Sequence, residues 1–184
     1  MKFTETPLRG ALVIDVEPFA DERGFFARTW CARELDAHGL ETELVQCSIS
    51  FNQHAGTLRG LHYQIAPHEE VKIVRCTAGA IFDVIVDLRT ESPTFLHHFG
   101  VTLSAHNHRS LYIPHGFAHG FQTLEPETEV AYQMSAFYQP DAARGVRWND
   151  PALAIEWPAT NHRIMNERDR TYPDLALPDR VRRS

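Results

Sequence analysis

The sequence predicts an all-β fold, and three of its features carry that prediction. Short runs rich in β-branched residues recur along the chain, as expected for strands. Turn signals such as Ser92-Pro93, His106-Asn107 and Pro114-His115-Gly116 separate these runs at intervals of roughly ten residues. Strands that alternate with long helical patterns, which are typical of a parallel sheet, are absent. We therefore predict a β-sandwich or a β-barrel.

The expected elements follow one another along the chain. Pro18–Gly24 is predicted to be a turn-rich loop, and Cys31–Gly39 a helix that ends at its glycine. After Pro140 the pattern becomes irregular, with one short helix predicted at Glu167–Arg170. The predicted strands are Ala11–Val16, Gly24–Trp30, Glu43–Asn52, Val71–Cys76, Ile81–Leu88, Thr94–Leu103, Arg109–Ile113, Gly120–Leu124 and Val130–Ser135.

The stretch Gly56–Arg89 contains the most informative strand pattern. Alternate side chains of a strand face one side, so Lys72 shares a face with the apolar Val74 and Cys76. A lysine among apolar neighbours indicates a pocket. The alternative interpretation is an edge lysine that prevents aggregation.

Composition sets the class of protein. The 184 residues, 43% of them hydrophobic and 23% charged, predict one soluble domain over residues 1–184. A net charge of -6 argues against nucleic-acid binding but permits a cationic pocket for an anionic ligand. The three cysteines are scattered, so we expect no disulfide and a reducing compartment. Neither a signal peptide nor an apolar run of ~20 residues is present, which predicts a cytoplasmic protein without membrane contact.

The eleven histidines mostly fall in turns, where a surface role is expected. His62 and His119 differ, because each lies next to a strand of apolar residues. The segment Pro114–Phe121 resembles the second signature of the cupins, PxGxxHxF, and Gly60–Gly79 resembles a degraded first signature. Cupins are double-sheet jelly rolls or small barrels.

The first signature argues against a metal. Metal-binding cupins carry two histidines in its HxH position, and here that position holds His62-Tyr63-Gln64. With one imidazole missing, a site of three or four ligands is hard to assemble. We expect no metal. A convergence of His62, Glu70 and His119 is the alternative.

A longer series of segments extends the resemblance over nearly the whole chain. The segments, in order, are Arg59–Gln64, Lys72–Cys76, Phe82–Val84, Val86–Arg89, Ser92–Thr94, Ile113–Phe121, Tyr132, Tyr138–Pro140, Trp148–Pro151 and Ile155–Pro158. Together they resemble the dTDP-4-dehydrorhamnose 3,5-epimerase family. The resemblance implies a cupin-type double-sheet jelly roll with short flanking helices. It also implies an enzyme without cofactor that acts on a nucleotide-diphosphate sugar, and a homodimer in which an N-terminal strand crosses to the partner.

The resemblance assigns four residues to catalysis. His62 is the implied base that removes a proton beside the sugar ketone, since imidazole titrates near neutral pH. Asp169 is its implied carboxylate partner, which fixes the ring. Lys72 is expected to stabilise the enolate, and Tyr132 to donate a proton. Without the resemblance, Tyr132 is interpreted as a core tyrosine and Asp169 as a surface charge or helix cap.

The implied substrate contacts form a second set. Arginine suits a diphosphate because its planar fork makes paired hydrogen bonds. Tyr138 is the expected stacking ring for the nucleobase. The full set is Arg23, Phe26, Gln46, Arg59, Asp83, His119, Tyr138 and Arg168. Taken alone, Arg23 is a loop charge and Tyr138 a packing aromatic.

Departures from the family pattern cluster at the nucleoside end. Arg28 stands where the family has a carboxylate, Cys47-Ser48 replaces Asp-Asn, and Ala143 replaces an acid. Arg168 replaces a lysine, which is a mild change. The nucleotide therefore stays open between dTDP, CDP and GDP. Two alternatives also remain: a 3-epimerase only or a ketoisomerase of the same fold, and a non-catalytic sugar-binding cupin.

Overall fold

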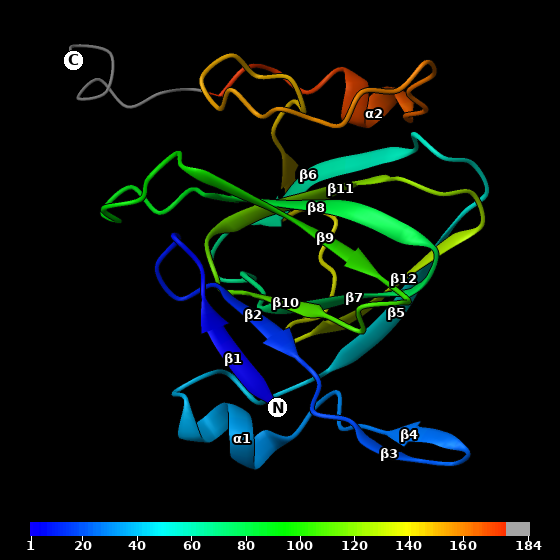
Figure 1. Ribbon diagram of the computed structural model, residues 1–184. Coiled ribbons are helices and arrows are strands. Elements are labelled where there is room, and N and C mark those ends of the chain that lie inside the picture. The colour runs from blue at the N-terminus through cyan, green and yellow to red at the C-terminus, as the bar shows by residue number, and fades with distance from the viewer. Residues whose placement is uncertain (176–184) are drawn as a thin grey trace.

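Two antiparallel β-sheets form the body of the molecule in the computed structural model, which describes residues 1–175 (Figure 1). The six-stranded sheet contains, in spatial order, β1 (Lys2–Glu5), β2 (Leu12–Asp15), β10 (Ser110–Ile113), β7 (Lys72–Ala78), β12 (Thr128–Met134) and β5 (Gln46–Asn52). The five-stranded sheet contains β13 (Ala143–Gly145), β6 (Leu58–Gln64), β11 (Phe117–Thr123), β8 (Ala80–Asp87) and β9 (His98–Ser104). The predicted all-β class is confirmed.

The space between the sheets holds the main hydrophobic core. Val74 on β7 and Leu111 on β10 contribute from one sheet, and Ile85 on β8 and Phe121 on β11 from the other. All four side chains are fully buried, and burial of this kind contributes about 1.5–3 kcal/mol for each large apolar side chain. The alternation of strand faces thus decides which residues enter the core and which face outward.

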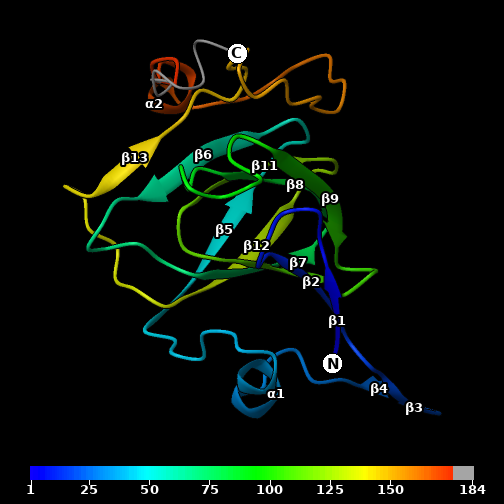
Figure 2. The ribbon, with the colours of Figure 1, turned by 90° about the vertical axis from the view of Figure 1, so that its left-hand side faces the viewer.

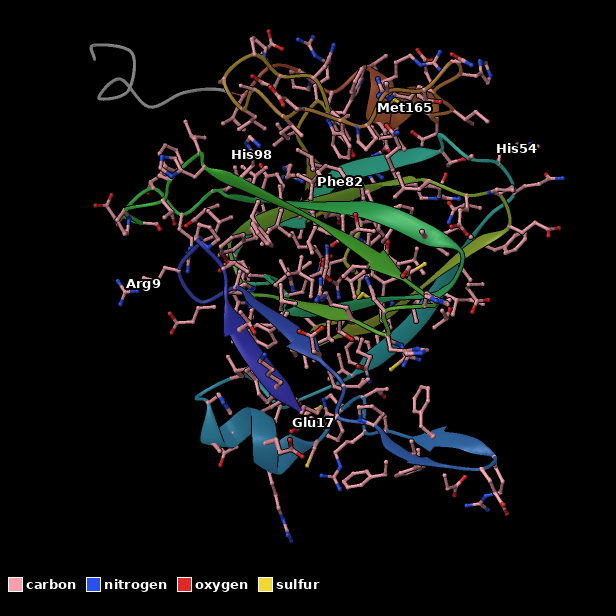
Figure 3. All side chains as sticks on the ribbon, in the orientation of Figure 1. Arg9, Glu17, His54, Phe82, His98 and Met165 are labelled. Atoms are coloured by element: carbon pink, nitrogen blue, oxygen red, sulfur yellow. The ribbon has the colours of Figure 1, made fainter. Side chains whose placement is uncertain are left out.

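The outer face of the five-stranded sheet is covered by the C-terminal part of the chain (Figures 1 and 2). This part contains the short helix α2 (Glu167–Arg170). Phe82 on β8 lies between the sheet and this segment (Figure 3), where its ring packs edge-on against Trp157 at a centroid distance of 6.3 Å. The C-terminal layer therefore holds α2 against β6. Both elements contribute side chains to the cavity described below.

The outer face of the six-stranded sheet carries the other helix, α1 (Ala32–Ala37). Its Leu35 packs against Ile14, Ile73 and Tyr112 of the sheet. Beside it, β3 (Phe19–Asp21) and β4 (Gly24–Phe26) form a separate hairpin that extends away from the body in both views (Figures 1 and 2).

Several predicted boundaries were wrong. The predicted strand Gly24–Trp30 ends at Phe26, and the predicted loop Pro18–Gly24 contains β3. Gly120–Leu124 is the second half of β11, which begins at Phe117, and the irregular region after Pro140 contains β13. The helix expected within Cys31–Gly39 is confirmed, as is Glu167–Arg170.

The main omission was β6, which the sequence pattern did not indicate. Apolar alternation is missing there because Arg59, His62 and Gln64 line a polar cavity instead of the core. A strand that faces a binding pocket does not show the usual apolar face.

Two further expectations concern the whole chain. The single domain over residues 1–184 stays a prediction, and its residues 176–184 lie outside the described part. Within residues 1–175, none of the helices has the length and apolar character needed to cross a membrane.

Candidate active site

A cavity of about 380 Å³ is lined by strands from both sheets. Eight residues of the predicted catalytic and substrate-binding sets lie in its wall: Gln46, Arg59, His62, Lys72, His119, Tyr132, Tyr138 and Arg168. The wall also contains residues outside these two predicted sets: Ser48, Ile49, Ser50, Tyr63, Gln64, Glu70, Gly120, Phe121, Met134, Ala143 and Arg144.

His62 on β6 is held by the carboxylate of Asp169 on α2. The Nε2 atom of His62 lies 2.7 Å from Oδ1 of Asp169, while the second oxygen accepts the N–H of Gly60 at 3.0 Å. Asp169 is 1% exposed, whereas 42% of the His62 side chain faces the open cavity. Burial by itself raises the pKa of the Asp169 carboxyl, but His62, Gly60 and Arg168 together hold it below its usual value. The carboxylate is therefore ionised at neutral pH and fixes the ring.

Gly60 allows β6 to approach β11 closely. It has φ +119°, and a Cβ atom on it would come within 2.6 Å of the Gly120 Cα atom. The close approach brings His62 opposite His119 in the strand register, with an irregularity between His119 and Phe121. Both imidazoles consequently reach the same cavity.

His119 forms a second pair with a carboxylate. Its Nε2 atom lies 2.7 Å from Oδ1 of Asp83 on β8, and the two residues are 3% and 0% exposed. Burial raises the pKa of Asp83, against the opposing effects of His119 and Lys72. The other oxygen of Asp83 has no hydrogen-bond partner within residues 1–175. Asp83 does not line the cavity itself. It lies behind the wall and holds His119, which lines the cavity.

Tyr132 reaches the cavity from β12, in the opposite sheet to His62. Burial, the main cause, and the nearby Asp83 raise the pKa of its phenol far above its ordinary value, with Arg59 opposing. The phenol is therefore protonated throughout the neutral range. Its ring lies edge-on to His119 at a centroid distance of 6.0 Å. Such a group can give a proton only to a strongly basic carbon or oxygen.

Lys72 is in the centre of a sheet, because β7 lies between β10 and β12. The alternative of an edge lysine is therefore wrong. Val74 and Cys76 share its face and enter the core, as the strand period predicted. The ammonium of Lys72 lies 2.9 Å from Glu70, and both side chains are about nine-tenths buried.

The mouth of the cavity is formed by cationic and amide side chains. Arg59 donates from Nε to Asn52 at 2.7 Å, and Gln46 accepts the backbone N–H of Tyr138 at 3.3 Å. Tyr138 is 52% exposed, as a ring available for stacking would be. Arg168 lies beside it and carries a raised pKa, chiefly through the Tyr138 hydroxyl. These groups can bind an anion and a flat ring.

Arg23 and Phe26 do not reach this cavity. Both lie on the β3–β4 hairpin, where Arg23 is paired with Asp21 and Phe26 is 77% exposed. The hairpin points away from the body, so neither residue lines the pocket of its own chain. The prediction that they bind substrate is not met within one chain.

The alternative metal site does not assemble. In the described part of the chain, no group of three His, Cys, Asp or Glu side chains could hold a metal ion. His62, Glu70 and His119 are each paired with a different charged residue.

Comparison with known proteins identifies the family. The family model described as dTDP-4-dehydrorhamnose 3,5-epimerase matches residues 5–176. This chain belongs to that family. The predicted isomerase class and the cupin-type fold are thereby confirmed.

Individual relatives agree with the family assignment. The dTDP-4-dehydrorhamnose 3,5-epimerase of Shigella flexneri is 42% identical over 170 residues, which are 92% of this chain and 93% of the relative. The Bacillus anthracis epimerase, solved with TDP and PPi bound, has a TM-score of 0.91 at 45% identity and covers 95% of this chain and 99% of its own. A 3′-monoepimerase from Streptomyces bikiniensis, solved with dTDP-quinovose, has a TM-score of 0.86 at 30% identity and covers 96% of this chain and 89% of its own.

Sequence reasoning missed Gln64 and Glu70 as parts of the site. Gln64 appeared only within the segment Arg59–Gln64 and in place of a second metal-binding histidine, and Glu70 only as an alternative ligand. The spacing of Gln64 two residues after His62 was the available signal, because such residues share a strand face. Glu70 stands two residues before Lys72, so the same spacing was the available signal for their pairing.

Proposed function

We propose that this protein inverts carbons 3 and 5 of a dTDP-linked 4-keto-6-deoxy sugar, as its relatives' names describe for them. One observation carries the proposal: His62 and Tyr132 line one cavity from opposite sheets. Inversion of a carbon centre requires removal of a proton from one face and delivery to the other, and a sugar bound between these residues meets both.

The first step is proton removal by His62. The ketone at carbon 4 acidifies the hydrogens on both neighbouring carbons, so imidazole is a sufficient base. The proton passes from the sugar carbon to the imidazole ring of His62. The electron pair of the C–H bond moves onto the carbonyl oxygen, which gives an enolate. Asp169 stabilises the imidazolium that results, while Lys72 provides the cation for the enolate oxygen.

The second step is proton delivery by Tyr132. The enolate electron pair returns to carbon and takes the phenol proton on the opposite face, which restores the ketone. The high pKa of Tyr132 keeps it protonated until the enolate forms. The phenolate that remains is transient, and Arg59 is the cation of the cavity wall that acts on this phenol. The reaction exchanges protons only, and carbon, oxygen and electrons balance without a redox partner.

The cations and the exposed ring at the mouth support a nucleotide-diphosphate substrate. Arg59 and Arg168 are suited to the diphosphate, and Tyr138 to the base. We take dTDP as the nucleotide because the relatives' names specify it. The three free cysteines, one of them exposed, fit a reducing compartment, and we place the protein in the cytoplasm.

We also propose a homodimer in which the β3–β4 hairpin inserts beside the partner's cavity. Phe19 and Phe26 on this hairpin are 75% and 77% exposed. Large apolar side chains that gather on the surface in this way mark an interaction site. In the dimer, Arg23 and Phe26 would complete the neighbouring site, as the predicted substrate-binding set requires.

The test is turnover of dTDP-4-keto-6-deoxyglucose in heavy water, followed by NMR at carbons 3 and 5. Deuterium and inversion at both carbons are expected, and His62→Asn is the control without a base. Inversion at carbon 3 alone would establish the one-carbon alternative. A new ketone position would establish a ketoisomerase.

Binding measurements with dTDP, CDP and GDP accompany the turnover assay. We expect dTDP to bind most tightly. Equal weak binding of all three, with no deuterium incorporation, would overturn the proposed function in favour of a different ligand.

A further inference from the structure

Glu70 lies immediately before β7 and forms part of the cavity wall. One of its oxygens, Oε1, is 2.9 Å from the Lys72 ammonium. The other oxygen, Oε2, accepts a hydrogen bond from the side-chain amide of Gln64 at 3.3 Å. With only 9% of its side chain exposed, Glu70 is a buried carboxylate with a defined partner on each oxygen.

Gln64 is itself held on several sides. Its amide nitrogen also donates to the carbonyls of His68 at 2.9 Å and Phe137 at 3.3 Å. Its amide oxygen accepts the backbone N–H of Gln139 at 2.6 Å. Gln64 is 4% exposed, so a rigid and nearly dry network stands behind Glu70.

The network gives Lys72 a fixed position. A lysine side chain has a flexible four-carbon stem and is otherwise free to turn. Removing the partner of a nearly buried ion leaves an uncompensated charge, which is strongly unfavourable. Glu70 therefore supplies both the geometry and the counter-charge that keep the ammonium in the cavity wall.

Other charged and titratable groups face Lys72 from the surrounding strands. Asp83 on β8 lies behind the wall, and its partner His119 on β11 lines it. Tyr132 on β12 and His62 on β6 face the same cavity. The ion pair of Lys72 at salt-bridge distance is with Glu70.

We propose that Glu70 is a positioning residue for catalysis, and that it acts through Lys72. It holds the ammonium where the enolate oxygen develops. This inference rests on the proposed function, because it assumes that Lys72 stabilises an enolate. Glu70 need not contact the sugar itself.

The expected kinetic effect follows from that role. A preorganised cation stabilises the transition state more than the ground state, so losing its position lowers kcat and leaves KM nearly unchanged. A displacement of ~1 Å can reduce the rate by about 10²-fold. We expect Glu70→Ala to lower kcat about tenfold to a hundredfold. Glu70→Gln, which can still accept from the ammonium but lacks the counter-charge, should recover part of the loss.

The matched control is Glu69→Ala, which removes the same charge from the neighbouring, exposed position. It is expected to leave kcat and KM unchanged. A double-mutant cycle with Lys72→Ala separates positioning from a general structural role. In the Lys72→Ala background, Glu70→Ala should cause no further loss of kcat. An equal loss in both backgrounds, or an unchanged kcat in Glu70→Ala, would overturn the proposal.

A second measurement does not depend on turnover. It therefore distinguishes failure of the proposed positioning role from failure of the proposed function. Ion pairing in a nearly buried site slows exchange of ammonium protons with water, and NMR detects the Lys72 side-chain nitrogen while exchange is slow. We expect this signal in the natural protein and in Glu70→Gln, and its broadening in Glu70→Ala. An unchanged signal in Glu70→Ala would refute the positioning role even if the natural protein turned over no dTDP sugar.

Discussion

His62 and Tyr132 belong to different sheets and line the same cavity, with His119 between them in the wall. His119 is opposite His62 in the strand register, and its ring lies 6.0 Å from that of Tyr132. The base and the donor are therefore built on separate rigid supports. A side-chain change in one need not displace the other, so their roles can be tested separately.

Replacing Tyr132 with phenylalanine should separate proton exchange from inversion. His62 can still remove the proton and return a solvent deuteron to the same face. We expect deuterium at the substrate carbons with retained configuration, and a loss of inversion of about 10²-fold or more. NMR of the substrate after incubation in heavy water measures both. Loss of exchange together with inversion would contradict the separation of roles.

Replacing Asp169 with asparagine should impair the base without unfolding the protein. The amide can still accept the Gly60 N–H, but it carries no charge to stabilise the imidazolium of His62. We expect kcat to fall by about 10²-fold or more, while KM changes little. Thermal unfolding monitored by circular dichroism provides the check on folding. An unchanged kcat would show that His62 needs no partner.

Asp87 provides a prediction about stability and pH. Burial raises the pKa of its carboxyl, but hydrogen bonds from Arg89, Ser92 and Thr94 lower it to about 2. Because the folded pKa lies below the unfolded value of about 3.9, the stabilisation is present above pH ~4 and is lost as the pH falls towards 2. The difference corresponds to about 2 kcal/mol of unfolding free energy at neutral pH. Urea unfolding of Asp87→Asn at pH 7 and at pH 3 should show a loss that is larger at pH 7.

Asp21 offers a matched control for that measurement. It also pairs with an arginine two residues later, but its side chain is 47% exposed. Because water screens an exposed pair, Asp21→Asn should change the unfolding free energy far less. Equal effects of the two substitutions would show that the buried network around Asp87 adds nothing.

Complementation tests the proposed exchange of hairpins between subunits. Arg23→Ala and His62→Asn should each reduce activity strongly in a pure sample. If the hairpin completes the partner's cavity, a mixed dimer contains one cavity with both intact residues. Mixing the two inactive proteins after reversible dissociation should therefore restore up to about a quarter of the natural activity by random pairing. A mixture that stays inactive, or a monomeric mass in solution, would count against the hairpin exchange.

The sequence by itself determined the β class, the alternation of side chains between the two faces of β7, and the family. Val74 and Cys76 alternate with Ile73, and this period of two is a local property that the chain carries before it folds. The ordered motifs nominated His62, Lys72, Tyr132 and Asp169, although they are spread over more than half the chain. Their roles stay predictions until the variants are measured.

Only the tertiary structure decided which charged groups meet. The pairing of Asp83 with His119 and the course of β6 beside β11 depend on close approach of strands that are distant in sequence. The position of Arg23 and Phe26 outside their own cavity was likewise invisible in the motif that contains them. Hydrophobic periodicity reports burial one strand at a time, whereas an electrostatic contact depends on distance in space, which the fold alone sets.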